Sequence, residues 1–268
     1  MNESTSMVAF RRSSRKFRVT LAALLISAVI VWAADTPWKS KPYQKWDDND
    51  IHKVLFDSPW AHIAQVSAKW RPAGDETTGL PAGSVPPAGN PNGAIPAGPA
   101  SSGISALSGA AVGSQRGEYP IAQYYVDWVS SKTMRAALAQ RDVLHSGKAP
   151  ADAEQSISQV QPDYVVLMQG ADMAPFVRAD EKFFQANAFL QFKTSGQKVS
   201  PERVEYQRGP DGKSVAGALF FFPKKLPSGD PSIQPGEKSI EFVCKLGEST
   251  LKASFEPQKM VAPSGPDL

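Results

Sequence analysis

A long stretch without hydrophobic periodicity divides this chain and limits what can fold. Between residues 71 and 118, half of the chain's 20 glycines are interspersed with prolines, alanines and serines. Such a composition provides too little apolar surface to offset the entropy lost on ordering. We therefore predict a disordered, low-complexity linker at 71–118, stiffened locally by proline. A compact core then has to be built from the segments on either side of it.

The first 33 residues have the three-part pattern of a secretion signal. Five basic residues between positions 11 and 18 precede the uncharged apolar run Val19–Val31, and small residues follow at Ala33 and Ala34. The run is shorter than the roughly 20 residues that span a bilayer. We predict a signal peptide at 1–33 and an exported bacterial protein, periplasmic or extracellular. The alternative is an uncleaved N-terminal helix that anchors the chain, which would be its one contact with a membrane.

The positive charge of the chain belongs to this leader. The formal net charge is +3, and residues 1–33 contribute +4, from five basic residues against Glu3. The remainder therefore carries −1, so the mature chain gives no electrostatic reason to expect nucleic acid as a partner.

Two segments have the periodicity of folded structure. Residues 35–70 form a small tryptophan-rich unit, with a helix that begins at Asp47 or Asp48, a second helical turn at Ser58-Pro59, and a strand over 63–70. Residues 119–262 form the main domain, and 263–268 are a tail with little to pack.

The main domain changes its hydrophobic period along the chain. Its first part predicts strands over 122–129 and 164–168 and helices over 131–144, 152–161 and 180–187, with Asp152 and Gln155 as a capping pair. Its second part predicts a strand over 188–194 and two hairpins, over 203–222 and 238–255. We predict an α+β fold, a mainly antiparallel sheet with two or three helices on one face. A β-sandwich with inserted helices is the alternative.

The single cysteine and the absence of sequence motifs restrict the chemistry. Cys244 lies on the apolar side of an alternating strand, which predicts a buried small hydrophobe. His52 and His62 match no zinc spacing, and no nucleophile elbow, P-loop or dinucleotide fingerprint is present. We therefore predict no catalytic, cofactor or metal site. The acids near element ends, taken as capping or solvated, are Asp127, Asp163, Asp172 and Asp180.

The tryptophans are concentrated in the N-terminal unit. Trp38, Trp46, Trp60 and Trp70 all lie between residues 35 and 70. Tryptophan is enriched at binding hot spots, which makes Trp46, Trp60 and Trp70 candidate contacts for a partner. The alternative is that these rings fasten the unit onto the main domain.

Three stretches carry a loose resemblance to a known group. The segment 46–61 holds W-x-x-x-D and then D-S-P-W-A (Asp57–Ala61), the segment 126–139 follows, and the chain closes with F-x-x-x-x-M-V from Phe255 to Val261. In these stretches the chain resembles a group of uncharacterised exported bacterial proteins. The resemblance implies export and a shared architecture, and it implies no activity.

Two functional classes remain open at this point. The first is a non-catalytic binding or structural module of the cell envelope, with an envelope or extracellular partner that the sequence does not specify. The second is an envelope hydrolase that uses paired carboxylates, which would require two acids in one deep pocket.

Overall fold

A computed structural model describes residues 36–71 and 119–268 of the chain. The predicted signal peptide and, apart from Arg71, the predicted linker lie outside the described residues. The described residues from Pro37 onward belong to one structural unit. Within the described ranges, no helix combines the length and the apolar character needed to cross a membrane.

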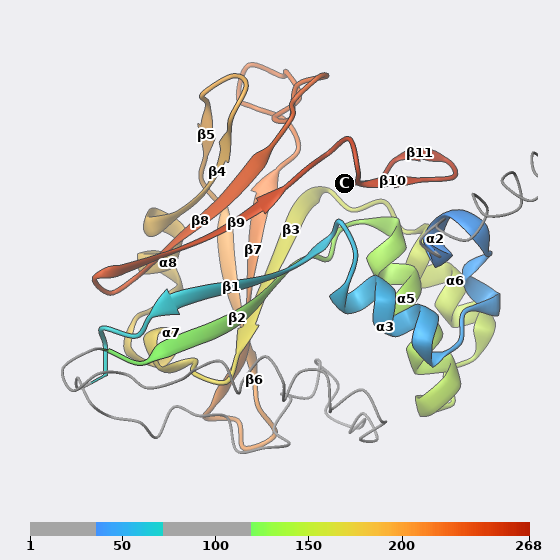
Figure 1. The fold of residues 1–268 in the computed structure, drawn as a ribbon, viewed down its shortest axis with the longest axis horizontal. Coiled ribbons are helices and arrows are strands. Elements are labelled where there is room, and N and C mark those ends of the chain that lie inside the picture. Colours follow the sequence, from blue (N-terminus) through green and yellow to red (C-terminus); the bar gives the residue numbers. More distant parts are fainter. Residues whose placement is uncertain (1–35, 72–118) are drawn as a thin grey trace, which may run out of the picture. The chain divides into compact units, whose positions relative to one another are not determined.

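The strands form two main sheets, and every strand pair among the described residues is antiparallel. The larger sheet has the order β1-β2-β3-β7-β6, and the smaller has the order β5-β4-β8-β9 (Figure 1). The larger sheet contains β1 (Ala61–Ser67), β2 (Ile121–Trp128), β3 (Asp163–Gly170), β6 (Arg203–Arg208) and β7 (Val215–Pro223). The smaller contains β4 (Ala188–Phe192), β5 (Lys198–Val199), β8 (Ile240–Leu246) and β9 (Ser249–Phe255). A small hairpin joins β10 (Val261–Ala262) and β11 (Gly265–Pro266).

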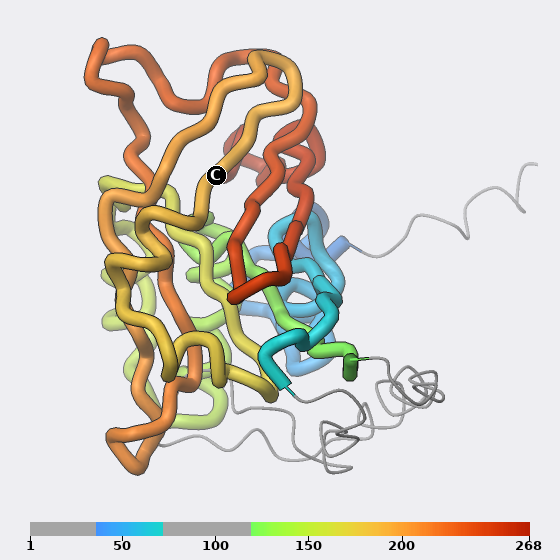
Figure 2. The backbone as a smooth tube through the Cα atoms, turned by 90° about the vertical axis from the view of Figure 1, so that its left-hand side faces the viewer, coloured from blue at the N-terminus to red at the C-terminus, as the bar shows by residue number. Residues whose placement is uncertain are grey.

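Four of the helices gather beside one end of the sheets, as Figures 1 and 2 show from two sides. They are α2 (Pro37–Ser40), α3 (Asp48–Phe56), α5 (Lys132–Ser146) and α6 (Pro150–Ser158), together with the 3-10 turn η2 (Tyr43–Lys45). The short helices α7 (Ala174–Arg178) and α8 (Glu181–Asn187) connect β3 of the larger sheet to β4 of the smaller.

One hydrophobic core lies between the two sheets. In β2 the alternate residues Tyr124, Val126 and Trp128 are fully buried, as the period of two requires. The ring of Trp128 lies 5.2 Å from that of Phe255 in β9, which belongs to the opposite sheet. Burial of each such aromatic side chain contributes about 1.5–3 kcal/mol. Cys244 is fully buried in β8, which confirms the prediction of a small hydrophobe at this position.

The predicted α+β class with mainly antiparallel strands is confirmed. The two sheets also face each other across a shared core, a feature of the sandwich alternative. The Ser58-Pro59 pair forms a turn instead of a helical turn. Helix α6 begins at Pro150 with Ala149 as its N-cap, so the predicted cap at Asp152 is wrong. The helix begins at Pro150 because proline is favoured in the first helical turn, where its missing N–H would have no partner within the helix.

Asp267 holds three parts of the chain together. Its carboxylate accepts hydrogen bonds from the backbone N–H groups of Lys132 and Thr133, at 2.6 and 2.8 Å, in the first turn of α5. A helix N-terminus favours a negative charge, because its first N–H groups have no partner within the helix. The carbonyl of Asp267 accepts from the indole Nε1 of Trp60 at 2.6 Å, and its N–H donates to Met260. Asp267 is thus buried and Leu268 packs against the core, whereas Pro263, Ser264 and Pro266 of the predicted tail are exposed.

We expect Asp267→Ala to lower the free energy of unfolding by about 2–3 kcal/mol, because it leaves two helix N–H groups without a charged acceptor. Urea unfolding followed by circular dichroism measures this change. Glu248→Ala, which removes an exposed acid from the β8–β9 turn, is the control and should cost well under half as much. Equal losses in the two variants would contradict the role of Asp267.

Candidate functional site

The D-S-P-W-A segment forms the turn that links α3 to β1. Helix α3 ends at Phe56 with Asp57 as its C-cap. The hydroxyl of Ser58 donates to the Val54 carbonyl at 2.6 Å and accepts from the N–H of Trp60 at 3.3 Å. The fully buried ring of Trp60 then fixes this turn against the core. The turn is therefore held by hydrogen bonds at Ser58 and by a buried ring at Trp60.

This turn lines a pocket of about 400 Å³, a volume in the range of small-molecule sites. Because its walls come from distant parts of the sequence, only the folded chain forms it. We call it the turn pocket. It is lined by Trp38, Phe56, Asp57, Ser58, Pro59, Ala61, His62, Glu256 and Lys259.

His62 is the titratable group most affected by the pocket's surroundings. Burial lowers the pKa of its imidazole below the ordinary 6.5, while the Pro59 backbone and the charge of Glu256 act to raise it. Its ring lies 4.7 Å from that of Phe255, edge to face. The Nε2 atom is buried and has no hydrogen-bond partner. Because the net shift is downward, the ring is neutral at pH 7.

Trp38, which also lines the turn pocket, carries a second buried polar atom without a partner. Its side chain is 7% exposed and packs edge to face on Trp60, with the ring centroids 5.7 Å apart. The indole Nε1 is buried and forms no hydrogen bond. A buried donor without a partner costs about 1–3 kcal/mol. Because this atom and the Nε2 atom of His62 are both shielded from solvent, that cost falls on the stability of the fold.

The remaining charged residues of the turn pocket are open to solvent. Asp57 is exposed. The side chains of Glu256 and Lys259 form an ion pair at 2.8 Å and are 52% and 64% exposed. Sequence reasoning missed these two residues, because only the turn after β9 brings them beside the D-S-P-W-A segment.

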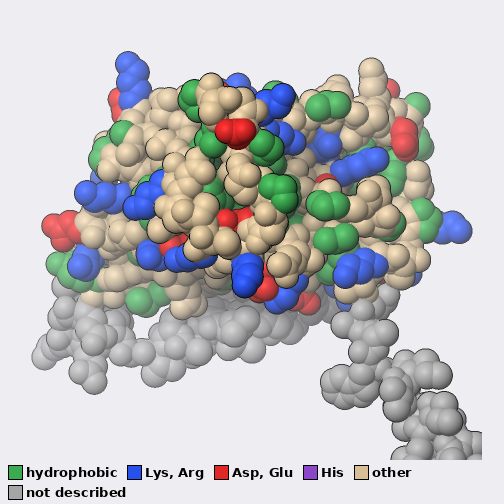
Figure 3. Space-filling model, turned by 90° about the horizontal axis from the view of Figure 1, so that it is seen from above, with side chains coloured by type: hydrophobic (Ala, Val, Ile, Leu, Met, Phe, Trp, Pro, Cys, Tyr) green, Lys and Arg blue, Asp and Glu red, His purple; other side chains and the backbone are tan. Residues whose placement is uncertain are grey.

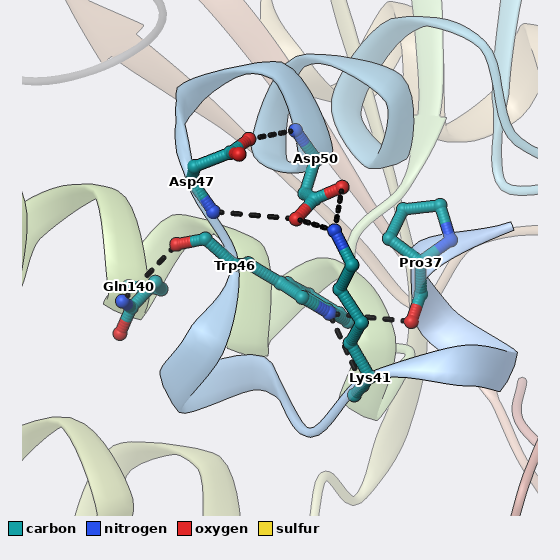
Figure 4. Close-up of polar contacts among 6 residues, drawn as sticks. All are labelled: Pro37, Lys41, Trp46, Asp47, Asp50 and Gln140. Carbon is teal, nitrogen blue, oxygen red and sulfur yellow. Dashed lines mark hydrogen bonds and ion pairs between the residues drawn. The ribbon is translucent and has the colours of Figure 1, made fainter. Parts of the chain in front are cut away.

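Trp46, a predicted partner contact, lies inside the helical group (Figure 4). It is 4% exposed, and its indole Nε1 donates to the carbonyls of Pro37 and Lys41, at 3.3 and 3.2 Å. Its own carbonyl accepts from the Gln140 amide of α5 at 3.3 Å. Trp46 therefore ties the start of the described chain to α5 through its ring and its carbonyl, and the ring is buried.

Trp60 and Trp70, the other predicted contacts, also bond within the fold. Trp60 is fully buried. The indole Nε1 of Trp70 donates to a carboxylate oxygen of Asp172 at 2.7 Å. The same oxygen forms an ion pair with Arg71 at 2.7 Å. These contacts join the end of the first segment to the loop after β3. This geometry fits the interpretation in which the tryptophans fasten residues 35–70 to the main domain.

The four acids considered for catalysis have separate roles. Asp172 accepts from Trp70, Arg71 and the N–H of Ala174, and Asp180 caps α8 by accepting from the N–H of Phe183. Asp163 lies 3.8 Å from Arg203. None of these acids lines the turn pocket.

Asp127 differs, because its carboxyl is buried without a compensating partner. It lies in β2 opposite Ala61 of β1 and Leu167 of β3, and it is 9% exposed. Its Oδ1 atom has no hydrogen-bond partner. Burial raises the pKa of this carboxyl well above its ordinary value, because the charged form loses its hydration.

Neither a metal-binding cluster among the described residues nor a strongly charged patch on the face in Figure 3 marks another site. In the described ranges, no three His, Cys, Asp or Glu side chains are grouped to hold a metal ion. On the face in Figure 3, acidic and basic side chains are interspersed. Comparisons with protein-family models, curated proteins and solved structures gave no match to this chain.

We expect Asp127→Asn to raise the free energy of unfolding relative to the wild type, and we expect this gain to grow as the pH rises. In the unfolded chain this carboxyl ionises near pH 4, whereas in the folded chain it stays protonated to a higher pH. Between those two values the folded state binds more protons, so wild-type stability falls with rising pH, and asparagine removes that loss. Urea unfolding at pH 5 and pH 7.5 measures the difference, with Asp152→Asn as an exposed control. A difference that does not change with pH would contradict this account.

Proposed function

We propose that this chain is a non-catalytic binding module of an exported protein, and that the turn pocket is its ligand site. The observation that carries the proposal is the turn pocket itself, a cavity of about 400 Å³ lined both by apolar side chains and by His62, Asp57 and Glu256. A concave, mainly apolar site with a few polar groups is typical of small-molecule binding.

The construction of the turn pocket also supports a binding role. Its apolar walls, Trp38, Phe56 and Pro59, bury ligand surface, while a few polar groups set orientation. The turn at 57–61 is held by hydrogen bonds of Ser58 and by the buried ring of Trp60, and a site that is formed in advance reduces the ordering cost of binding. Placement in the cell envelope rests on the leader pattern at 1–33.

We expect Asp57→Trp to reduce ligand binding at least tenfold, because the larger side chain occupies space in the turn pocket. The purified protein is mixed with the small-molecule fraction of an envelope extract, and the compounds retained on ultrafiltration are identified by mass spectrometry. Asp152→Trp, an exposed aspartate in the first turn of α6, is the matched control. Retention of the same compounds by both variants would argue against the turn pocket as the site.

One observation favours a second candidate, the envelope hydrolase. Asp57 and Glu256 are two carboxylates in one pocket, together with a neutral histidine. Both carboxylates are exposed, however, whereas the general acid of a glycosidase is held in an apolar environment. The test is turnover of a glycan or peptide substrate. Loss of turnover in Asp57→Asn and in Glu256→Gln, with turnover kept in Asp152→Asn, would favour this candidate over the binding module.

A further inference from the structure

The outer face of the smaller sheet carries a surplus of lysine. In β8, Phe242 and Cys244 are fully buried toward the core, so the alternate residues Glu241, Val243 and Lys245 lie on the opposite side of the sheet. The antiparallel register of β4, β5 and β9 places their alternate residues on this same side. We call it the lysine face, after four exposed lysines. They are Lys193, Lys198, Lys245 and Lys252.

Side-chain contacts agree with this placement. The ammonium groups of Lys193 and Lys252 lie 3.1 and 3.6 Å from the same carboxylate oxygen of Glu241. The ammonium of Lys198 lies 4.6 Å from the centre of the Phe189 ring, which belongs to the outer side of β4. Lys245 lies opposite Thr250 of β9 in the register. The four lysines therefore share one side of the sheet.

The lysine face is positive although the chain beyond the leader is not. Glu241 is the only acid in the four strands, all of which lie in the described ranges. The face thus holds four positive charges against one negative charge. Because the chain beyond residue 33 has a net charge of −1, the surplus of three on this face leaves −4 for the rest of it. The positive charge is therefore concentrated on one side of the fold.

Protection of sheet edges explains only part of the surplus. Lysine on an edge strand commonly prevents pairing with another sheet. This reason applies to Lys198 in β5 and Lys252 in β9, which are the edge strands of the smaller sheet. It does not apply to Lys245 in the inner strand β8, or to Lys193, which follows the inner strand β4. These two positions need another reason, and attraction to an anionic surface provides one.

The lysines are distributed over a plane and not along a line. Each lies in or directly after a different strand, and each lies in a different row of paired residues. With about 4.8 Å between strands and about 3.4 Å per residue along them, the four positions span roughly 14 Å by 20 Å. An extended polymer would contact a line of charges, whereas a planar anionic surface can contact all four.

We infer that the lysine face docks on a membrane surface that contains acidic phospholipid. Acidic lipids give the surface a negative potential, which attracts basic residues within a screening length. Lysine suits such a diffuse field, because it is a compact charge on a flexible stem. None of the exposed large hydrophobic side chains of the described residues lies on this face, so the attachment is electrostatic and reversible.

This attachment differs from the one that the sequence predicted. The sequence analysis expected contact with a membrane only through an uncleaved leader, whereas the lysine face lies in the folded part of the chain. The inference also goes beyond the proposed function, because it does not involve the turn pocket. A module that binds a small molecule would in this way be held close to a lipid surface of the envelope.

The first test measures binding of the protein to vesicles by sedimentation. The chain from residue 34 onward keeps the structural unit that begins at Pro37 and lacks the basic leader, whose own charge would obscure the result. It should bind vesicles of phosphatidylcholine with one third phosphatidylglycerol, and it should not bind pure phosphatidylcholine. Salt at about 1 M, where the screening length is about 3 Å, should abolish the binding.

Variants then test whether the lysine face is the contact. Lys198→Gln combined with Lys245→Gln should weaken binding on the order of 25-fold, about fivefold for each lysine. Lys39→Gln combined with Lys213→Gln is the matched control, because it changes the net charge equally at exposed positions of α2 and the β6–β7 turn. Glu241→Gln removes the acid of the face and should strengthen binding about fivefold. Circular dichroism checks that each variant is folded.

Four results would overturn the inference. They are no binding to acidic vesicles at low salt, binding that survives about 1 M salt, equal losses in the two double variants, and tighter binding to soluble polygalacturonate than to the vesicles. The last result would assign the lysine face to an anionic polysaccharide. The proposed function is tested separately, by the retention experiment with Asp57→Trp, so either can fail without the other.

Discussion

The hydrogen bond between Trp60 and Asp267 joins residues 207 positions apart, and the rest of the structure depends on it. The ring of Trp60 is fully buried, and its indole N–H needs an acceptor there. Asp267 supplies that acceptor with its carbonyl, while its carboxylate caps α5. One contact thus fixes the α3–β1 turn, the first turn of α5 and the end of the chain relative to one another.

The turn pocket is a consequence of the same contact. One wall is the segment 57–62, which the buried Trp60 ring holds in place, and the other is the turn after β9, at Glu256 and Lys259. The N–H of Asp267 bonds to Met260, next to that turn, and β9 itself packs against Trp128 through Phe255. Both walls are therefore attached to the core, one next to the buried Trp60 and the other between the buried Phe255 and Met260.

Local pattern predicted most of the elements, and long-range contacts account for what it missed. The hairpins, α3 and α5 follow from turn glycines, caps and hydrophobic period, which neighbouring residues determine. The role of Asp267 carries no local signal, since a Pro-Gly-rich stretch with one acid is typical of a solvated tail. The pocket was also beyond sequence reasoning: D-S-P-W-A was noticed only as a resemblance, and nothing local links it to Glu256 or pairs Trp38 with His62. The export prediction concerns residues outside the described ranges and stays a prediction.

Several aromatic side chains of the core are buried although their polar atoms have no partner. The indole of Trp128 lies in β2, and the rings of Trp38 and His62 pack edge to face on Trp60 and Phe255. A buried polar atom without a partner costs about 1–3 kcal/mol, whereas burial of a large apolar side chain contributes about 1.5–3 kcal/mol. At these positions the stability of the fold therefore comes from the packing of the rings and not from hydrogen bonds.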